Sequence, residues 1–337
     1  MKIKVVVVDD SALMRKVLSN MINACRDMEV VDVARNGKEA LRIIERSQPD
    51  LVTLDVEMPE MNGIETLKVL KERYTMPVIM LSSKKNERTT IEALELGAED
   101  FIEKPLSIKD NGTAFQEDLE IRIHSHFPED KRTVKVNKEK SLLPNLLIDK
   151  KDALKAITIG ASTGGPKALV QVIQSISEQL SVPVFIVQHM PEGFTASFAQ
   201  RLDSLSSVEV LEAQDNMRIK AGTVYLAPGG KHMVIRKNKI RLNEEAKIHG
   251  VRPAVDYLFE SAAETYGKDI LGLILTGMGN DGADGCEKIK QAGGYIVSQD
   301  KQTSIVYGMP RVVFERGLSD QVGSLNDIAD IIKEMTR

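Results

Sequence analysis

Short apolar runs alternate with longer stretches of helical periodicity through the first third of the chain. The run at residues 3–10, IKVVVVDD, is rich in valine and ends in two acidic residues, which is typical of a strand buried on both faces of a parallel sheet. Apolar residues then recur at helical spacing, including Leu13, Val17 and Met21. The same alternation predicts further strands at residues 30–34, 51–59, 77–83 and 100–105. Five strands separated by helices predict a doubly wound α/β sheet over residues 1–124, with ligands at the carboxyl ends of its strands.

The pattern changes over residues 125–152, which are highly charged and show little periodicity, so we predict a linker there. A second doubly wound α/β series follows over residues 153–337. Its predicted strands occupy residues 155–160, 182–189, 222–228, 232–237, 239–243, 271–277 and 294–299. Because a short RKNK turn separates two of these strands, we expect a β-hairpin and a mixed, mostly parallel sheet.

Length and composition narrow the classes of protein that fit these two domains. A chain of 337 residues is too long for one ordinary core, and a formal net charge of −4 without a basic helix-turn-helix region argues against nucleic acid as a partner. No segment resembles a signal peptide, and the apolar runs fall short of the roughly 20 residues that a membrane span needs. Cys25 and Cys286 lack metal-binding spacing, so both are expected to be free thiols in a reducing cytoplasm.

Acidic residues gather at the carboxyl ends of the first-domain strands. Asp9, Asp10 and Asp55 end the first and third strands, and three carboxylates so close together favour a bound Mg²⁺. Ser82 ends the fourth strand and Lys104 follows the fifth, where a hydroxyl and an ammonium group could stabilise a phosphoryl group on an aspartate. The alternative is that each of these five residues is a solvated turn residue. This alternative explains any one of them well, but it explains the set of five poorly.

These motifs resemble the receiver domains of two-component response regulators, which have a flavodoxin-like fold. The segments VDDSALMR, DVEMPEMNG, PVIMLSS and FIEKP occur in that order over residues 1–124. The resemblance implies that Asp55 accepts phosphate from a histidine kinase. It further implies that Asp10, Asp55 and the backbone carbonyl of Glu57 bind Mg²⁺, with Asp9 acting through water. Phe101 takes the switch aromatic position, and Ser82 replaces the commoner threonine.

A different chemistry is indicated where the second domain begins. GASTG at residues 160–164 fits the G-x-S-x-G pattern of a turn that exposes a nucleophilic Ser162. Two alternatives share the pattern: a glycine-rich turn that binds a phosphate through its amides, and a strand–helix turn with a capping serine. The dinucleotide pattern G-x-G-x-x-G is not satisfied there.

A nucleophilic serine needs a base, and His189 stands alone among the five histidines in ending an apolar strand. A strand-end histidine can also be a simple polar cap. The glycine-rich loop at residues 273–285 carries Asp281, which we expect to accept a hydrogen bond from His189 Nδ1, and its N–H groups could form an oxyanion hole. The alternative for this oxygen-rich loop is a calcium or phosphate site, although EF-hand spacing is absent.

The second domain resembles the catalytic domain of the chemotaxis protein-glutamate methylesterases, the CheB family. GASTGG, QHMP, LAPGGKHM, RPAVD and TGMGNDGA stand at residues 160–165, 188–191, 226–233, 252–256 and 276–283. The resemblance implies that Ser162 is the nucleophile, His189 the base and Asp281 the carboxylate that orients the base. It also implies that the Met278 N–H is an oxyanion donor and that Thr163 lines the site.

The two resemblances together imply a phosphorylation-activated hydrolase. Its substrates are glutamate methyl esters on methyl-accepting chemotaxis receptors, and it also deamidates receptor glutamines. We expect a cytoplasmic monomer that needs no cofactor for ester hydrolysis and whose receiver covers the serine until Asp55 is phosphorylated. Two alternatives are a non-enzymatic response regulator that acts as a binding module and a metal-dependent hydrolase built on residues 273–285. Arg252 is expected to pair with Asp256, and the alternative is that it steers an acidic receptor surface.

Overall fold

The computed structural model describes residues 2–83, 87–105, 108–127 and 154–336. The chain divides into two compact units, residues 1–132 and 133–337, and each is described by itself. The predicted linker falls outside the described residues from residue 128 onward. Both cysteines are free, as predicted. None of the helices in the described ranges is long and apolar enough to cross a membrane.

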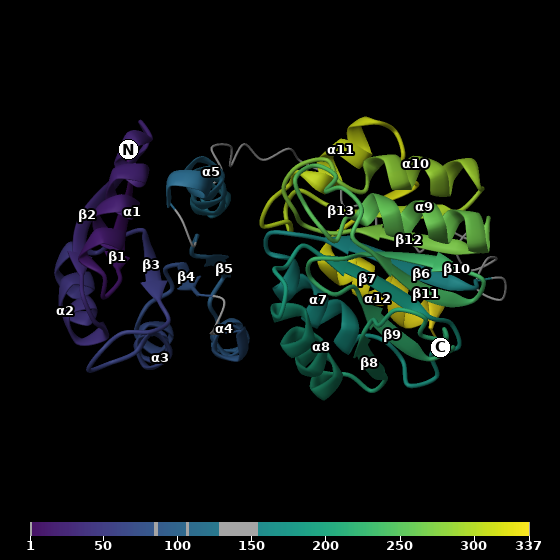
Figure 1. Ribbon diagram of the computed structural model, residues 1–337, viewed down its shortest axis with the longest axis horizontal. Helices are drawn as coiled ribbons and strands as arrows, with labels where there is room; N and C mark the ends of the chain where they lie inside the picture. Colours follow the sequence, from purple (N-terminus) through teal and green to yellow (C-terminus); the bar gives the residue numbers. More distant parts are fainter. Residues whose placement is uncertain (1, 84–86, 106–107, 128–153, 337) are drawn as a thin grey trace. The chain divides into compact units, whose positions relative to one another are not determined.

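The first unit is a five-stranded parallel sheet flanked by helices, as the hydrophobic pattern predicts (Figure 1). The strand order is β2-β1-β3-β4-β5, and every pairing is parallel. The strands are β1 (Ile3–Val8), β2 (Met28–Ala34), β3 (Leu51–Asp55), β4 (Val78–Ser82) and β5 (Asp100–Glu103). The helices are α1 (Ala12–Ala24), α2 (Gly37–Ser47), α3 (Gly63–Arg73), α4 (Glu87–Glu95) and α5 (Ile108–Ser125). The valines of β1 are fully buried because helices cover both faces of this interior strand.

The second unit is built on a seven-stranded sheet in the order β14-β13-β12-β6-β7-β9-β8. Its strands are β6 (Ala156–Ala161), β7 (Val184–Gln188), β8 (Glu209–Glu212), β9 (Thr223–Leu226), β12 (Ile270–Ile274), β13 (Tyr295–Gln299) and β14 (Gln321–Gly323). Every pairing between these strands is parallel. The edge strands β8 and β14 were not predicted from the sequence, because they are short and only partly buried and so lack a continuous apolar run.

The predicted hairpin forms, but as a sheet of its own. Strands β10 (His232–Arg236) and β11 (Lys239–Asn243) pair antiparallel and are not part of the seven-stranded sheet, so that sheet is not mixed. The apolar side of the hairpin packs on helix α9 (Val255–Tyr266), where Met233 and Ile235 join the same buried cluster as Leu258. The hairpin therefore covers the outer side of a helix and adds no strand to the main sheet.

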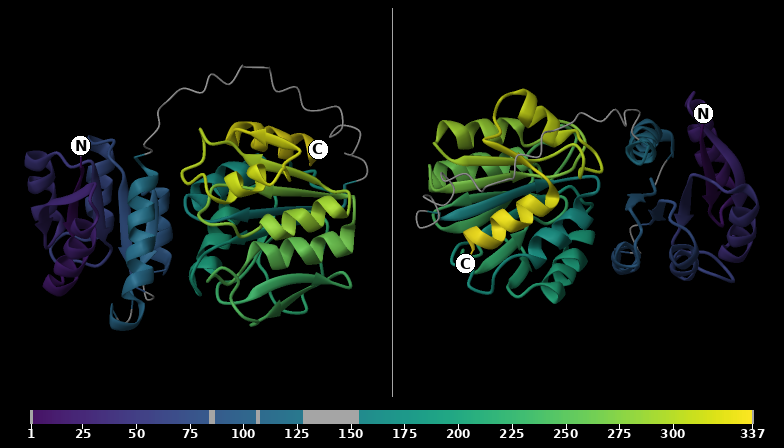
Figure 2. Two further views of the ribbon diagram at one scale, coloured as in Figure 1. Left: turned by 90° about the horizontal axis from the view of Figure 1, so that it is seen from above. Right: turned by 180° about the vertical axis from the view of Figure 1, so that it is seen from behind.

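Helices cover both faces of the seven-stranded sheet (Figures 1 and 2). Helices α9, α10 (Ala283–Gln291) and α11 (Met309–Glu315) lie on one face, and α7 (Gly165–Gln174), α8 (Phe194–Leu205) and α12 (Leu325–Met335) lie on the other. The chain leaves β6 toward α7 and leaves β12 toward α10, so the connections after these neighbouring strands diverge to opposite faces. Such a switch point in a doubly wound sheet is where ligands bind.

Candidate active site

Ser162 lies in the turn after β6, and its hydroxyl does not cap the helix that follows. Helix α7 has Gly164 at its N-cap position, and no side chain caps it. Gly164 has a φ of +75°, a left-handed conformation that glycine adopts without strain. Within the described ranges the Ser162 hydroxyl makes no hydrogen bond, so the interpretation of this residue as a capping serine is wrong.

Close packing behind the turn explains its small residues. A Cβ atom on Gly165 would lie 1.9 Å from Gln188 Oε1, so a larger residue cannot fit without displacing that side chain. Gln188 Nε2 donates to the Ser162 carbonyl oxygen at 2.9 Å. The Ser162 N–H donates to the Thr276 carbonyl oxygen at 3.0 Å. The backbone of the serine is thus tied to the end of β7 on one side and to the segment after β12 on the other.

His189 is placed beside the serine by the register of two neighbouring strands. Ala161 at the end of β6 pairs with Gln188 at the end of β7, so Ser162 and His189 are the next residues beyond a matched pair. The His189 N–H donates to the Ala161 carbonyl oxygen at 3.1 Å, which continues the ladder past the strand ends. No hydrogen bond joins the two side chains within the described residues; such bonds are often long before substrate binds.

Asp281 reaches His189 from the loop after β12, through the other ring nitrogen from the one expected. His189 Nε2 lies 2.7 Å from Asp281 Oδ2, so the expectation that Nδ1 faces this carboxylate is wrong. Since an ionised carboxylate can only accept, Nε2 carries the proton and Nδ1 is the nitrogen left for the serine. The cause is the direction of approach: Asp281 comes from β12, on the far side of β6 from the strand that precedes the histidine.

Two backbone amides hold the same carboxylate. Asp281 Oδ2 accepts from the Val255 N–H at 2.7 Å, and Oδ1 accepts from the Asp256 N–H at 3.1 Å. Both amides open helix α9, whose N-cap residue, Ala254, has no side chain able to cap it. Burial acts to raise the pKa of Asp281, but the hydrogen bond and charge of His189 and the two amides outweigh it, so the pKa is lowered overall. Asp281 is therefore a fixed anion at neutral pH.

In the part of the chain that the structure describes, the loop at residues 276–279 and the turn after β6 each supply an unpaired backbone donor beside the serine. A Cβ atom on Gly277 would lie 2.7 Å from Ser162 Cβ, so this glycine allows the loop to contact Ser162. Among the described residues, the N–H groups of Met278 and Thr163 donate to no acceptor. Free amides at this place are suited to receive a developing oxyanion. The Met278 side chain is 42% exposed, while Thr163 is buried.

A separate acidic site lies at the carboxyl ends of the first-unit strands. The Lys104 ammonium is 2.7 Å from both Asp9 Oδ2 and Asp55 Oδ1. Burial is the largest influence on Asp55, and with the charges of Asp9 and Asp10 it raises the pKa to about 6, although Lys104 acts in the opposite direction. Burial acts to lower the pKa of Lys104, but the two neighbouring carboxylates raise it overall. The structure thus brings together the acids and the lysine that the sequence pattern singled out.

The donor set at this place fits a magnesium ion. Oxygen atoms of Asp9, Asp10 and Asp55 lie within 4.8 Å of one another, and carboxylates are ligands that Mg²⁺ prefers. Asp10 and Glu57 line a cavity of about 750 Å³ at the same end of the sheet. The coordination of Mg²⁺ by these residues, including the Glu57 carbonyl, stays a prediction.

Ser82 and Phe101, which together with Lys104 form the predicted receiver switch, are both buried. Ser82 Oγ shares a 2.6 Å hydrogen bond with Thr90 Oγ1 of α4 and donates to the Ser83 carbonyl oxygen at 3.2 Å. Its hydroxyl is thus engaged with α4 in this structure, and its role toward a phosphoryl group stays a prediction. Phe101 is 5% exposed and packs inside the unit.

Sequence reasoning missed one pair of residues near Asp281. His249 Nε2 lies 3.5 Å from Asp256 Oδ2, so Asp256 faces this histidine and is not the expected partner of Arg252. Arg252 Nη1 donates to the carbonyl oxygens of Glu244 and Glu245. The RPAVD motif drew attention to Asp256, but its position in the chain carried no indication of a role.

Comparison with known proteins assigns both units. A CheB methylesterase family model matches residues 157–332, and a response regulator receiver domain model matches residues 5–115. The chain belongs to the CheB methylesterase family. This finding confirms the two resemblances that the sequence motifs indicate.

Relatives within the CheB family match along nearly the whole chain. A protein-glutamate methylesterase/protein-glutamine glutaminase of Pyrococcus horikoshii is 44% identical, covering 98% of this chain and 93% of that protein. One of the same name from Clostridium acetobutylicum is also 44% identical, covering 100% of this chain and 98% of that protein. The crystal structure of the Thermotoga maritima CheB methylesterase catalytic domain matches with a TM-score of 0.52 at 42% identity, covering 54% of this chain and 98% of that one.

Proposed function

We propose that this chain is a phosphorylation-activated protein-glutamate methylesterase that removes methyl groups from chemotaxis receptors. The observation that carries the proposal is the bond between His189 Nε2 and Asp281, formed beside a serine whose hydroxyl the fold leaves unused. The relatives named methylesterase and glutaminase support the substrate class. Neither the binding-module nor the metal-hydrolase alternative accounts for this arrangement.

The geometry suits acyl transfer through a covalent intermediate. Ser162 Oγ attacks the ester carbonyl carbon while His189 Nδ1 takes the hydroxyl proton. The carbonyl oxygen gains negative charge and is received by the Met278 N–H, with Thr163 lining the same place. His189 then gives its proton to the leaving methoxide, and methanol departs from an acyl-enzyme. Water, activated by His189, attacks the acyl carbon and releases the glutamate and the serine.

Deamidation of receptor glutamines follows the same route. The amide carbonyl takes the place of the ester carbonyl, and His189 protonates the departing nitrogen so that ammonia leaves. The acyl-enzyme is the same in both reactions, so a single serine serves both. An unprocessed receptor incubated with the enzyme gains about one mass unit per converted site, because an NH₂ group is replaced by OH; no mass change at glutamine would remove this part of the proposal.

Control by the first unit rests on Asp55. Bound Mg²⁺ would neutralise phosphoryl oxygens, and Asp9, Asp10, Asp55 and the Glu57 carbonyl are the groups that would hold it. Lys104 already faces Asp55 and would pair with a phosphoryl oxygen on it. We propose that a histidine kinase is the phosphodonor and that the unphosphorylated receiver limits access to Ser162. A cytoplasmic monomer is part of the same proposal.

Methanol release from methylated receptor membranes tests both parts. The wild type, Ser162→Ala and Asp55→Asn are compared with and without a small phosphodonor, and Ser204→Ala, an exposed helical serine, is the matched control. We expect Ser162→Ala to lose about 10³-fold or more under both conditions. Asp55→Asn should keep the basal rate and lose the stimulation. Retained activity in Ser162→Ala would show that the serine turn has another role.

A further inference from the structure

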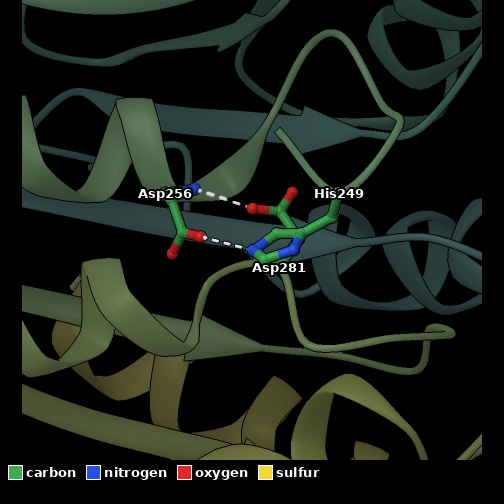
Figure 3. Close-up of side chains that lie close together, drawn as sticks. All are labelled: His249, Asp256 and Asp281. Atoms are coloured by element: carbon green, nitrogen blue, oxygen red, sulfur yellow. Dashed lines mark hydrogen bonds and ion pairs between the residues drawn. The ribbon is translucent and has the colours of Figure 1, made fainter. Parts of the chain in front are cut away.

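A second buried carboxyl group lies directly behind the one that orients His189. Asp256 follows Val255 at the start of α9, and its own N–H donates to Asp281 (Figure 3). Donor atoms of His249, Asp256 and Asp281 all lie within 4.8 Å of one another. Asp256 and Asp281 are 7% and 2% exposed, so water does little to screen one carboxyl group from the other.

The two carboxyl groups are held by unequal sets of donors. Asp281 accepts two backbone N–H groups and the His189 imidazole. Asp256 Oδ1 accepts the Gly285 N–H at 2.7 Å, while Oδ2 faces His249 Nε2 at 3.5 Å, longer than a good hydrogen bond. Because three of these four oxygens accept an N–H group and the fourth faces the His249 imidazole, the cluster is not built as a cation site.

Two negative charges this close together are unfavourable where both carboxyl groups are buried from water, so the pair retains one proton. Burial and then the Asp281 charge raise the pKa of Asp256 to about 7, and a hydrogen bond between the two carboxyl groups acts in the same direction. The better-held Asp281 has its pKa lowered. The retained proton therefore belongs to Asp256.

Other charged groups around Asp256 also influence where the proton lies, but they do not move it from Asp256 to Asp281. Asp284 adds a further negative charge that disfavours ionisation of Asp256. Arg316 carries the opposite charge and interacts electrostatically with Asp256, but its guanidinium is already paired with Asp284 and Glu287. Burial raises the pKa of the nearby Cys286 thiol, which therefore stays neutral. His249 contacts Asp256 from the loop before α9, with Nε2 toward Asp256 Oδ2.

We propose that Asp256 is a positioning residue, which holds a proton against the Asp281 carboxylate and so keeps that carboxylate anionic and turned toward His189. The proposal rests on the catalytic role proposed for Ser162, His189 and Asp281. When Asp256 loses its proton, the two carboxylates repel each other and Asp256 turns to His249. The orientation of Asp281 toward His189 is then weakened, so the neutral form of Asp256 is the productive one.

Asparagine at position 256 tests this, because it resembles the protonated acid in shape and stays neutral at every pH. In the full-length protein, kcat/KM for methanol release is measured from about pH 6 to about pH 9 for the wild type, Asp256→Asn and Asp256→Ala. We expect the ratio of Asp256→Asn to wild type to rise about threefold or more across neutrality. Asp256→Ala, which leaves the Gly285 N–H without its acceptor, should lose about tenfold at about pH 6, where the wild type holds its proton.

Two further measurements keep the test decisive. His249→Gln removes the imidazole toward which ionised Asp256 turns, so the rise in the ratio should move to higher pH. The infrared carbonyl band of a buried protonated carboxyl group should be present in the wild type near neutral pH and absent in Asp256→Asn; if that variant does not fold, the pH dependence of this band in the wild type and in His249→Gln decides alone.

A flat ratio, or a folded but inactive Asp256→Asn, would overturn the positioning role and leave Asp256 as a structural acceptor for Gly285. Ser162→Ala, assayed in parallel, separates this failure from that of the proposed function. If Ser162→Ala is inactive and the ratio is flat, the triad stands and the positioning role falls. If Ser162→Ala stays active, the triad falls, and the infrared band still reports whether Asp256 holds the proton.

Discussion

Both units bury aspartates at the carboxyl ends of parallel strands, yet they compensate the charge in different ways. In the first unit, Asp9 and Asp55 share one ammonium group, that of Lys104, at 2.7 Å from each. In the second unit, Asp281 is held by two amides at the start of α9 and by the imidazole of His189. The first arrangement relies on a flexible side chain, and the second relies mainly on backbone that cannot move away.

The difference in donors appears in the ionisation of the two carboxyl groups. Burial raises the pKa of Asp55 to about 6, because one lysine does not offset the loss of water and the neighbouring acids. Asp281 is at least as deeply buried, but its pKa is lowered overall. A carboxylate with too few donors is available to react, whereas one with fixed donors serves as a permanent charge. This matches the phosphoacceptor role proposed for Asp55 and the orienting role proposed for Asp281.

The same substitution in the two sites gives the largest contrast. Asp281→Asn removes the charge and presents an amide to a histidine that needs an acceptor, so kcat/KM for methanol release should fall about 10³–10⁴-fold. Asp55→Asn, assayed without phosphodonor, should remain within about twofold of the wild type. A small loss in Asp281→Asn would mean that the carboxylate is not needed to orient the base.

Removal of one backbone N–H tests how much the fixed donors contribute to holding the Asp281 carboxylate in place. Val255→Pro deletes the N–H that donates to Asp281 Oδ2 at a helix position where proline is well tolerated. A hydrogen bond to a charged group contributes about 1.5–3 kcal/mol, so kcat/KM should fall about 10- to 100-fold. Val255→Ala is the matched control, since it keeps the N–H and loses more of the buried side chain. Equal losses in the two variants would assign the effect to packing.

The smallest expected effect is on the stability of the first unit. Because the pKa of folded Asp55 lies near 6, above the unfolded value of 3.8, its favourable contribution is present below about pH 4 and is lost as the pH rises through 6. Asp55→Asn should therefore raise the free energy of unfolding at pH 8 by about 1–2 kcal/mol. Urea unfolding without Mg²⁺ at pH 8 and pH 4 measures this, and the gain should be absent at pH 4.

The sequence predicted the strands and strand-end residues well, because buried parallel strands are continuous apolar runs with polar residues at their ends. Ser162 and His189 were found for that reason, and the register of β6 and β7 places them side by side. The tautomer of His189 could not be predicted, because it depends on the side from which Asp281 approaches. Asp256 was missed as a site residue because only the meeting of α9 with the β12 loop gives it a carboxyl neighbour.

Helix α9 has no capping side chain of its own, and Asp281 supplies the cap from 26 residues further along the chain. The first two amides of the helix donate to the Asp281 carboxylate and must lose that hydrogen bond before they exchange with solvent. Hydrogen–deuterium exchange at Val255 and Asp256 therefore records how often the Asp281 carboxylate leaves its place. The exchange rates of these two amides therefore report how stably the proposed active site is assembled, and they can be measured without substrate.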